Sequence, residues 1–153
     1  MLLKKLISVL LCAILLCLSF SGCGDSYKDA FIYIDFDTIP TNLDPQLADS
    51  DEELTVVRSL FDTLLRYDSN GKITCSGANS YTKEGNTYTF ELNNDAKWVD
   101  GEAVTAHDYV FAFKRAVSPD TKAPFANSLF SIANAKEIYE GKKALSTLGV
   151  TAV

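Results

Sequence analysis

The sequence predicts a mixed α+β (α/β) fold in which short strands and hairpins combine with amphipathic helices. Three observations support this class. The 153 residues include 47% hydrophobic and 11% aromatic residues, enough to bury the core of one domain. Residues 86–119 contain a strand pattern, a turn and a capped helix in direct succession. Residues 64–74 contain a hairpin signal.

Residues 1–22 have the layout of a signal peptide: Lys4 and Lys5, an apolar run over 6–18, and small residues before Cys23. The run is short for a membrane span, although a buried helix or an anchor helix is the alternative. Residues 19–23 resemble a bacterial lipobox with Phe in place of the more usual Leu, so we expect Cys23 to be lipidated. Two acyl chains would anchor the protein stably, at about 0.8 kcal/mol for each buried CH₂.

The mature chain predicted by this leader is acidic and has few cysteines. Removal of residues 1–23 leaves 12 of the 14 basic residues against all 20 acidic ones, a net charge of −8. Such a surface repels nucleic acid and anionic lipid head groups, so the membrane contact is expected through lipid alone. Only Cys75 follows Cys23, which excludes a disulfide framework and favours a packed small side chain over a reactive thiol.

The first half of the mature chain predicts a tether, a strand and a helix. Residues 23–30 are small and polar and predict a lipidated tether. Residues 31–36 form a compact apolar run and predict a buried strand. Ser50 is a candidate N-cap with Glu53 at the third helical position, and the apolar face of this helix would consist of Leu54, Val57, Phe61 and Leu64.

The central part predicts hairpins and one well-capped helix. Asn70-Gly71 between two apolar-leaning runs predicts a tight turn. Residues 87–92 alternate apolar and polar side chains and predict a half-buried strand, and Asp100-Gly101 predicts a turn. Thr105 and Asp108 predict the start of a helix that ends before Pro119.

Beyond Pro119 the pattern predicts a loop over 120–124, a short helix over 132–139 that ends at Gly141, and a strand entering at 148–153. The abrupt end of this last segment suggests a fragment or a prematurely ended product.

Patterns for catalysis and for bound cofactors are weak. The only histidine, His107, lies in the first turn of a predicted helix, and neither GxSxG, HExxH nor a phosphate-binding glycine loop is present. The acidic runs 35–37 and 49–53 lack the glycine and the distal glutamate of a calcium loop. We therefore expect no enzyme activity, no cofactor and no metal.

Residues 86–119, together with SLFDTLLRYDSNGK upstream and PFANSL and EIYEGKKALSTLGV downstream, resemble the amino-terminal third of the extracellular solute-binding proteins of family 5. This family supplies the oligopeptide- and dipeptide-binding proteins of ABC importers. The resemblance implies a periplasmic-binding-protein-like fold of type II, with residues 31–65 at the start of lobe I. Residues 66–153 would form the small extra domain, truncated at its carboxyl end.

The resemblance also implies a ligand and the residues that contact it. A peptide would be held in an extended form by main-chain hydrogen bonds, and the segment that makes part of these contacts falls here on Asp49, Ser50 and Asp51. An aromatic residue after the loop proline faces the ligand cleft in the family, and here it is Phe125. Tyr81 stands where Trp is more common. The second lobe and the later residues that fix the peptide termini are absent from this sequence, so this part alone could not close on a ligand.

The resulting hypothesis is a monomeric, non-enzymatic receptor. It is lipid-anchored at the outer face of the cell membrane and delivers oligopeptides to the permease subunits of an ABC importer. Two alternatives remain at this point: a truncated surface lipoprotein or gene remnant without transport function, and an extracytoplasmic hydrolase.

Overall fold

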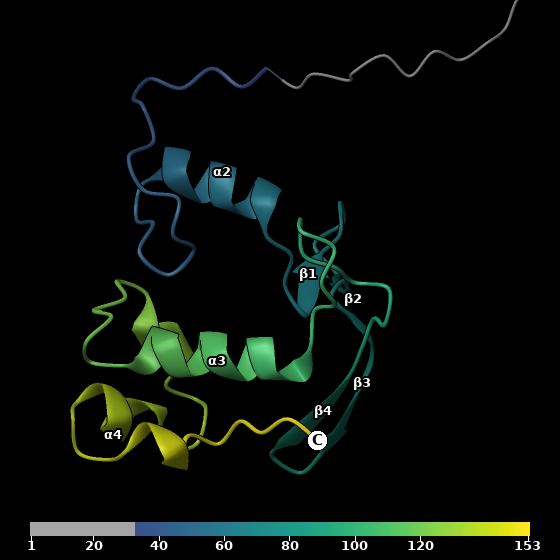
Figure 1. The fold of residues 1–153 in the computed structure, drawn as a ribbon, viewed down its shortest axis with the longest axis vertical. Coiled ribbons are helices and arrows are strands. Elements are labelled where there is room, and N and C mark those ends of the chain that lie inside the picture. Colours follow the sequence, from purple (N-terminus) through teal and green to yellow (C-terminus); the bar gives the residue numbers. More distant parts are fainter. Residues whose placement is uncertain (1–32) are drawn as a thin grey trace, which may run out of the picture. The chain divides into compact units, whose positions relative to one another are not determined.

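A computed structural model describes residues 33–153 of the chain. The predicted signal peptide (1–22), the predicted lipidation site Cys23 and the predicted tether (23–30) lie outside the described residues. The helices and strands drawn in Figure 1 all belong to one compact unit, Phe36–Val153.

The strand predicted over 31–36 is wrong for residues 33–36, the part of that range that the structure describes. Residues 33–36 are irregular, and the side chain of Tyr33 is 91% exposed. The two sheets of the described chain are built from β1 to β4 only. An apolar run can form a stable strand only where another strand pairs with it, and neither of these sheets includes this segment.

Helix α2 (Asp51–Leu60) begins at the predicted N-cap. The Ser50 hydroxyl oxygen accepts a hydrogen bond from the Glu53 N–H at 3.2 Å, which satisfies one of the free donors of the first turn. Val57 is buried, as the periodicity predicts. The apolar face is shorter than predicted, because Phe61 is the extended C-cap and Leu64 lies beyond the helix.

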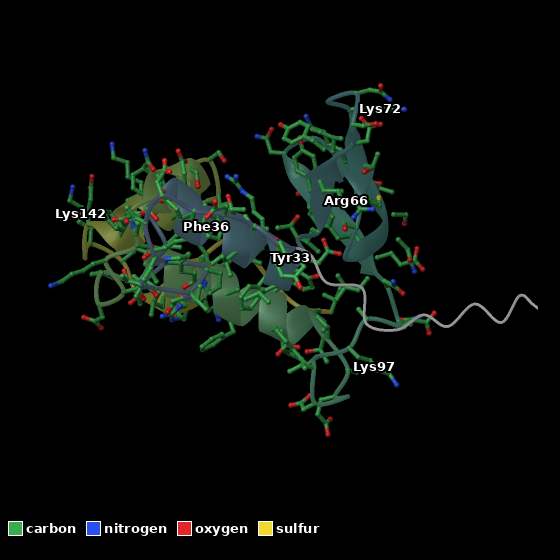
Figure 2. All side chains as sticks on the ribbon, turned by 90° about the horizontal axis from the view of Figure 1, so that it is seen from above. Tyr33, Phe36, Arg66, Lys72, Lys97 and Lys142 are labelled. Carbon is green, nitrogen blue, oxygen red and sulfur yellow. The ribbon has the colours of Figure 1, made fainter. Side chains whose placement is uncertain are left out.

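Strands β1 (Leu65–Tyr67) and β2 (Ile73–Cys75) form the predicted hairpin. The Asp68 carboxylate accepts hydrogen bonds from the N–H groups of Asn70 (2.8 Å) and Lys72 (2.9 Å), and Gly71 takes a positive φ of 76°. Arg66 and Lys72 belong to this hairpin and its turn (Figure 2). Cys75 is a free thiol of intermediate burial.

Strands β3 (Ala78–Glu84) and β4 (Thr87–Leu92) form a second antiparallel hairpin, in which β4 follows the predicted alternation and β3 was not predicted. Tyr81 pairs with Phe90 across the hairpin. The ring centroids of Tyr81, Tyr88 and Phe90 lie no more than 6.5 Å from one another. Such cross-strand aromatic contacts are a main source of stability in a two-stranded sheet.

Helix α3 (Ala106–Val117) follows a tight turn at Gly101, whose φ is 92°. Both features were predicted. The Asp108 carboxylate accepts hydrogen bonds from the Thr105 N–H at 2.7 Å and from the Thr105 hydroxyl at 2.8 Å, which fixes the first turn of α3. The helix ends at the Ser118 C-cap, directly before Pro119.

The last part contains η1 (Ala126–Leu129), α4 (Ala135–Tyr139) and η2 (Leu145–Thr147). Helix α4 begins three residues later than predicted, after Asn134 in a left-handed conformation (φ 65°), and Gly141 follows its end. The strand predicted over 148–153 is wrong, because these residues are irregular. No strand of the two sheets of residues 33–153 pairs with them.

The main core lies between the end of α3, helix α4 and the residues after η2. Its buried members are Val117, Ala135, Ile138 and Leu148, each no more than 4% exposed. Half-buried side chains pack around it: Phe113, Leu129, Phe130, Ile132 and Val150. In the part of the chain that the structure describes, no helix has both the length and the apolar character needed to cross a bilayer.

Candidate functional site

The segment that precedes α2, residues 41–50, is organised by the side chain of Glu53. The carboxylate oxygen Oε1 accepts hydrogen bonds from the Thr41 N–H (3.1 Å), the Thr41 hydroxyl (2.8 Å) and the Asn42 N–H (2.8 Å). The other oxygen, Oε2, accepts from the Asp49 N–H at 3.3 Å. Glu53 is 6% exposed, so one buried carboxylate holds both ends of the segment.

These contacts favour the ionised form of Glu53. The Thr41 hydroxyl lowers the pKa of the Glu53 carboxyl, burial opposes this effect, and the N–H groups of Asp49, Thr41 and Asn42 lower the pKa further. The position in the first turn of α2 adds to the preference for a negative charge. The carboxylate is therefore charged at neutral pH and acts only as an acceptor.

The middle of the segment is attached to α3 by Arg115. Its guanidinium donates to both carboxylate oxygens of Asp44, at 2.8 and 2.5 Å, and to the side-chain oxygen of Gln46 at 2.9 Å. The Gln46 amide in turn donates to the Ala112 carbonyl at 2.7 Å. Two-pronged pairing of a guanidinium with a carboxylate is geometrically demanding, so this contact fixes orientation as well as distance.

The pKa values agree with this ion pair. The hydrogen bond from Arg115 lowers the pKa of Asp44, against a smaller opposing effect of burial, and the Gln46 N–H lowers it further. The same hydrogen bond raises the pKa of Arg115. Both side chains are about one-third exposed, at 34% and 28%, so water weakens the attraction but does not remove it.

The predicted contact residues Asp49, Ser50 and Asp51 stand where this anchored segment joins α2. Asp49 is exposed, and its N–H is bound by Glu53. Ser50 is the N-cap, and Asp51 is the first residue of α2 with its carbonyl accepting from the Thr55 hydroxyl at 2.7 Å. The backbone of all three is thus fixed by local hydrogen bonds.

The fourth predicted contact, Phe125, lies on a different segment. It precedes η1, its carbonyl accepts from the N–H (3.1 Å) and hydroxyl (2.8 Å) of Ser128, and its side chain is 52% exposed. Within residues 33–153 no hydrogen bond or ring contact joins Phe125 to residues 49–51. The structure therefore presents the four residues as two separate groups.

Sequence reasoning missed the two anchors of the segment. Glu53 was recognised as a helix-capping residue, but its hydrogen bonds to Thr41 and Asn42 were not foreseen. Arg115 lies in the last turn of α3, where a cation is favoured by the helix alone, and its pairing with Asp44 joins residues far apart in sequence. The sequence does contain the two opposite charges, Asp44 in a turn and Arg115 near a helix end. Opposite charges alone do not show which residues pair.

Among residues 33–153 no cluster of three or more His, Cys, Asp or Glu side chains is placed to hold a metal ion. His107 is exposed in the first turn of α3.

The sequence pattern of the bacterial extracellular solute-binding proteins, family 5, matches residues 42–151. The chain belongs to this family. It is a family of solute-binding proteins and not of enzymes. The matched range includes residues 42–50 of the segment before α2, helix α2 itself, both hairpins and the core around α4.

Two relatives and one solved structure show how far the similarity extends. The chain is 42% identical over 115 residues to the periplasmic oligopeptide-binding protein OppA of Haemophilus influenzae, covering 72% of this chain and 21% of that protein. It is 30% identical over 164 residues to the oligopeptide-binding protein OppA of Bacillus subtilis, covering 98% of this chain and 30% of the relative. The structure of Listeria monocytogenes OppA bound to peptide matches 76% of this chain and 23% of that one, with a TM-score of 0.72 and 36% identity. The chain therefore spans less than a third of the length of these relatives.

Proposed function

We propose that this sequence belongs to the substrate-binding protein of an ABC importer that captures oligopeptides outside the cell membrane. The arrangement of residues 49–51 carries the proposal, because Glu53 binds the Asp49 N–H and the start of α2 fixes Ser50 and Asp51 in one backbone conformation. The similarity to relatives named as oligopeptide-binding proteins supports a peptide as the ligand.

In the proposed complex, residues 49–51 contribute main-chain hydrogen bonds to an extended peptide. The N–H of Asp51, at the first position of α2, has no acceptor within the helix and can donate to a peptide carbonyl. Main-chain recognition is independent of the side chains of the ligand, which suits a receptor for peptides of varied sequence.

Phe125 is proposed to supply an apolar contact with the ligand. Its half-exposed ring can pack against a peptide side chain while the backbone is held by Ser128 and η1. Phe offers the flat apolar face but no hydroxyl group, so it would not discriminate by hydrogen bonding.

The proposed organisation assigns residues 31–65 to the start of lobe I and residues 66–153 to the small extra domain. Capture of a ligand needs a second lobe as the opposite wall, in line with the greater length of the relatives. A signal peptide over 1–22 and lipidation of Cys23 would place the monomeric protein at the outer face of the membrane, where it meets the permease subunits.

Calorimetry on the protein produced from the complete open reading frame tests this proposal. We expect heat of binding with members of a set of tri- to pentapeptides and a single class of site. Absence of heat with every peptide, together with binding of a sugar or of a metal chelate, would place the protein in another branch of the family. Metabolic labelling with a fatty acid, lost in a Cys23→Ala variant, tests the anchor.

A further inference from the structure

The two oxygens of the Glu53 carboxylate have different partners. Oε1 binds the start of the segment through Thr41 and Asn42, and Oε2 binds its end through the Asp49 N–H. The main chain of Glu53 contributes as well, since its N–H donates to the Ser50 hydroxyl. Glu53 thus contacts the backbone of Asp49 and the side chain of Ser50, two consecutive residues of the proposed contact segment, without being part of that segment.

We propose that Glu53 is a positioning residue, which sets the backbone of residues 49–51 for a ligand that it does not itself touch. Its side chain is 6% exposed and its acceptors face the protein's own donors. This inference rests on the proposed function, because it assumes that residues 49–51 contact the peptide.

The different roles of the two oxygens allow a selective perturbation. In Glu53→Gln the amide oxygen can keep the three hydrogen bonds to residues 41–42, and the NH₂ group then faces the Asp49 N–H. The opposite orientation of the amide would place NH₂ against three donors and is worse. The substitution therefore replaces the acceptor at Asp49 with a donor and leaves the start of the segment in place.

Loss of this acceptor leaves a donor without a partner and lowers the fraction of molecules whose segment 49–51 has the binding conformation. The apparent dissociation constant rises in inverse proportion to that fraction. For a hydrogen bond to a charged group we expect an increase of about tenfold.

The test compares Glu53→Gln with a matched control in the complete protein. Thr41→Val removes the hydroxyl that donates to Oε1 and leaves the bond from Asp49 to Oε2 intact. The probe is the tightest-binding member of the peptide set in calorimetry on the unmutated protein. We expect Glu53→Gln to weaken binding about tenfold and Thr41→Val to leave it within about twofold, while both lower the melting temperature.

Amide hydrogen exchange supplies the readout that a general loss of stability would not move. In the unmutated protein without peptide, the Asp49 N–H should be protected, and in Glu53→Gln its exchange rate should rise by a larger factor than the rates of the main-core amides, which follow global stability. The measurement on the unmutated protein remains decisive if Glu53→Gln does not fold. An Asp49 amide that becomes protected only when peptide is added would overturn the inference.

The outcomes separate this inference from the proposed function. If the unmutated protein and Glu53→Gln bind the peptide with equal affinity, the positioning role alone is overturned. Equal weakening by Glu53→Gln and Thr41→Val also overturns it, because the effect would then follow stability. Failure of the unmutated protein to bind any peptide overturns the proposed function itself.

Discussion

Replacing Arg115 by Met and Asp44 by Asn, singly and together, measures the attachment of the 41–50 segment to α3. Met keeps most of the apolar stem of Arg115, and Asn keeps an acceptor for the Gln46 N–H, which donates to Asp44 at 3.0 Å. The double-mutant cycle on the free energy of unfolding isolates the interaction between the two side chains from their other contacts.

The partial exposure of both side chains places the expected energy of the Arg115–Asp44 interaction between the values for exposed and for buried ion pairs. Exposed ion pairs contribute about 0.2–1 kcal/mol, whereas breaking a buried pair costs about 3–5 kcal/mol. The Arg115–Asp44 pair has two direct hydrogen bonds and side chains that are 34% and 28% exposed. We therefore expect a coupling of about 1–2 kcal/mol at neutral pH, after allowing for screening by water.

The coupling should depend on pH with a defined sign. The pKa of Asp44 is lowered in the folded protein from its ordinary value of 3.8. A group whose pKa falls on folding contributes its full stabilisation above its unfolded pKa and loses it as the pH falls through the folded pKa. The coupling should be constant from neutral pH down to the region just above 3.8 and then decline.

Urea unfolding of the four proteins of the cycle, at neutral pH and at a series of pH values down to and below 3.8, provides the measurement. A coupling within about 0.5 kcal/mol of zero at neutral pH would refute the reasoning, because independent sites show the same scatter. A coupling that persists unchanged well below that pH would also refute it, since the interaction would then not depend on the Asp44 charge.

Two further substitutions test the packing around α3 and α4. Gly77→Ala places its Cβ against the Tyr109 hydroxyl and 3.1 Å from the Thr63 carbonyl oxygen, so we expect a loss of about 1–3 kcal/mol in unfolding free energy. In a Tyr109→Phe background most of this loss should vanish, and an unchanged loss would contradict the assigned clash. Ile138→Ala, at a side chain 1% exposed, should cost about 2–5 kcal/mol. The matched control Leu145→Ala, at 38% exposure, should cost clearly less, and similar losses would place the core elsewhere.

The elements that could be predicted are those fixed by neighbouring residues. The start of α3 follows from Thr105 and Asp108, which bind each other within one turn. The first hairpin follows from the Asp68 carboxylate and the glycine at position 71, which close their turn locally. In each case the residues that define the element lie within four positions of one another.

The errors concern segments whose structure depends on distant partners. Strand β3 has the polar sequence ANSYTKE and was missed, yet it pairs along its length with β4. The apolar runs 31–36 and 148–153 suggested strands that are not present in the described residues, because β1 to β4 do not pair with them. Apolar composition makes a strand possible, and only a partner makes it form.

The candidate site also combines features set by neighbouring residues with features set by residues far away in the sequence. Ser50 was predictable as an N-cap because its acceptor role lies within one helical turn. The conformation of residues 41–50 also requires Arg115, about seventy positions away, since Asp44 and Gln46 are oriented by its guanidinium. This distance explains why a local pattern could not identify Arg115 as the group that holds Asp44 and Gln46, whereas the contact residues 49–51 are predicted from resemblance alone.

The two anchors of the segment differ in what they constrain. Arg115 binds the middle of the segment and connects it to α3, so its loss should lower stability while residues 49–51 remain fixed to α2. Glu53 binds both ends of the segment from within α2, so its loss should change the backbone of residue 49 even where the attachment to α3 persists. If both statements hold, substitution of Arg115 lowers the melting temperature with little change in peptide affinity, whereas Glu53→Gln changes both. The attachment of the 41–50 segment to α3 and the geometry of residues 49–51 would then depend on two separate charged groups, Arg115 on α3 and Glu53 in α2.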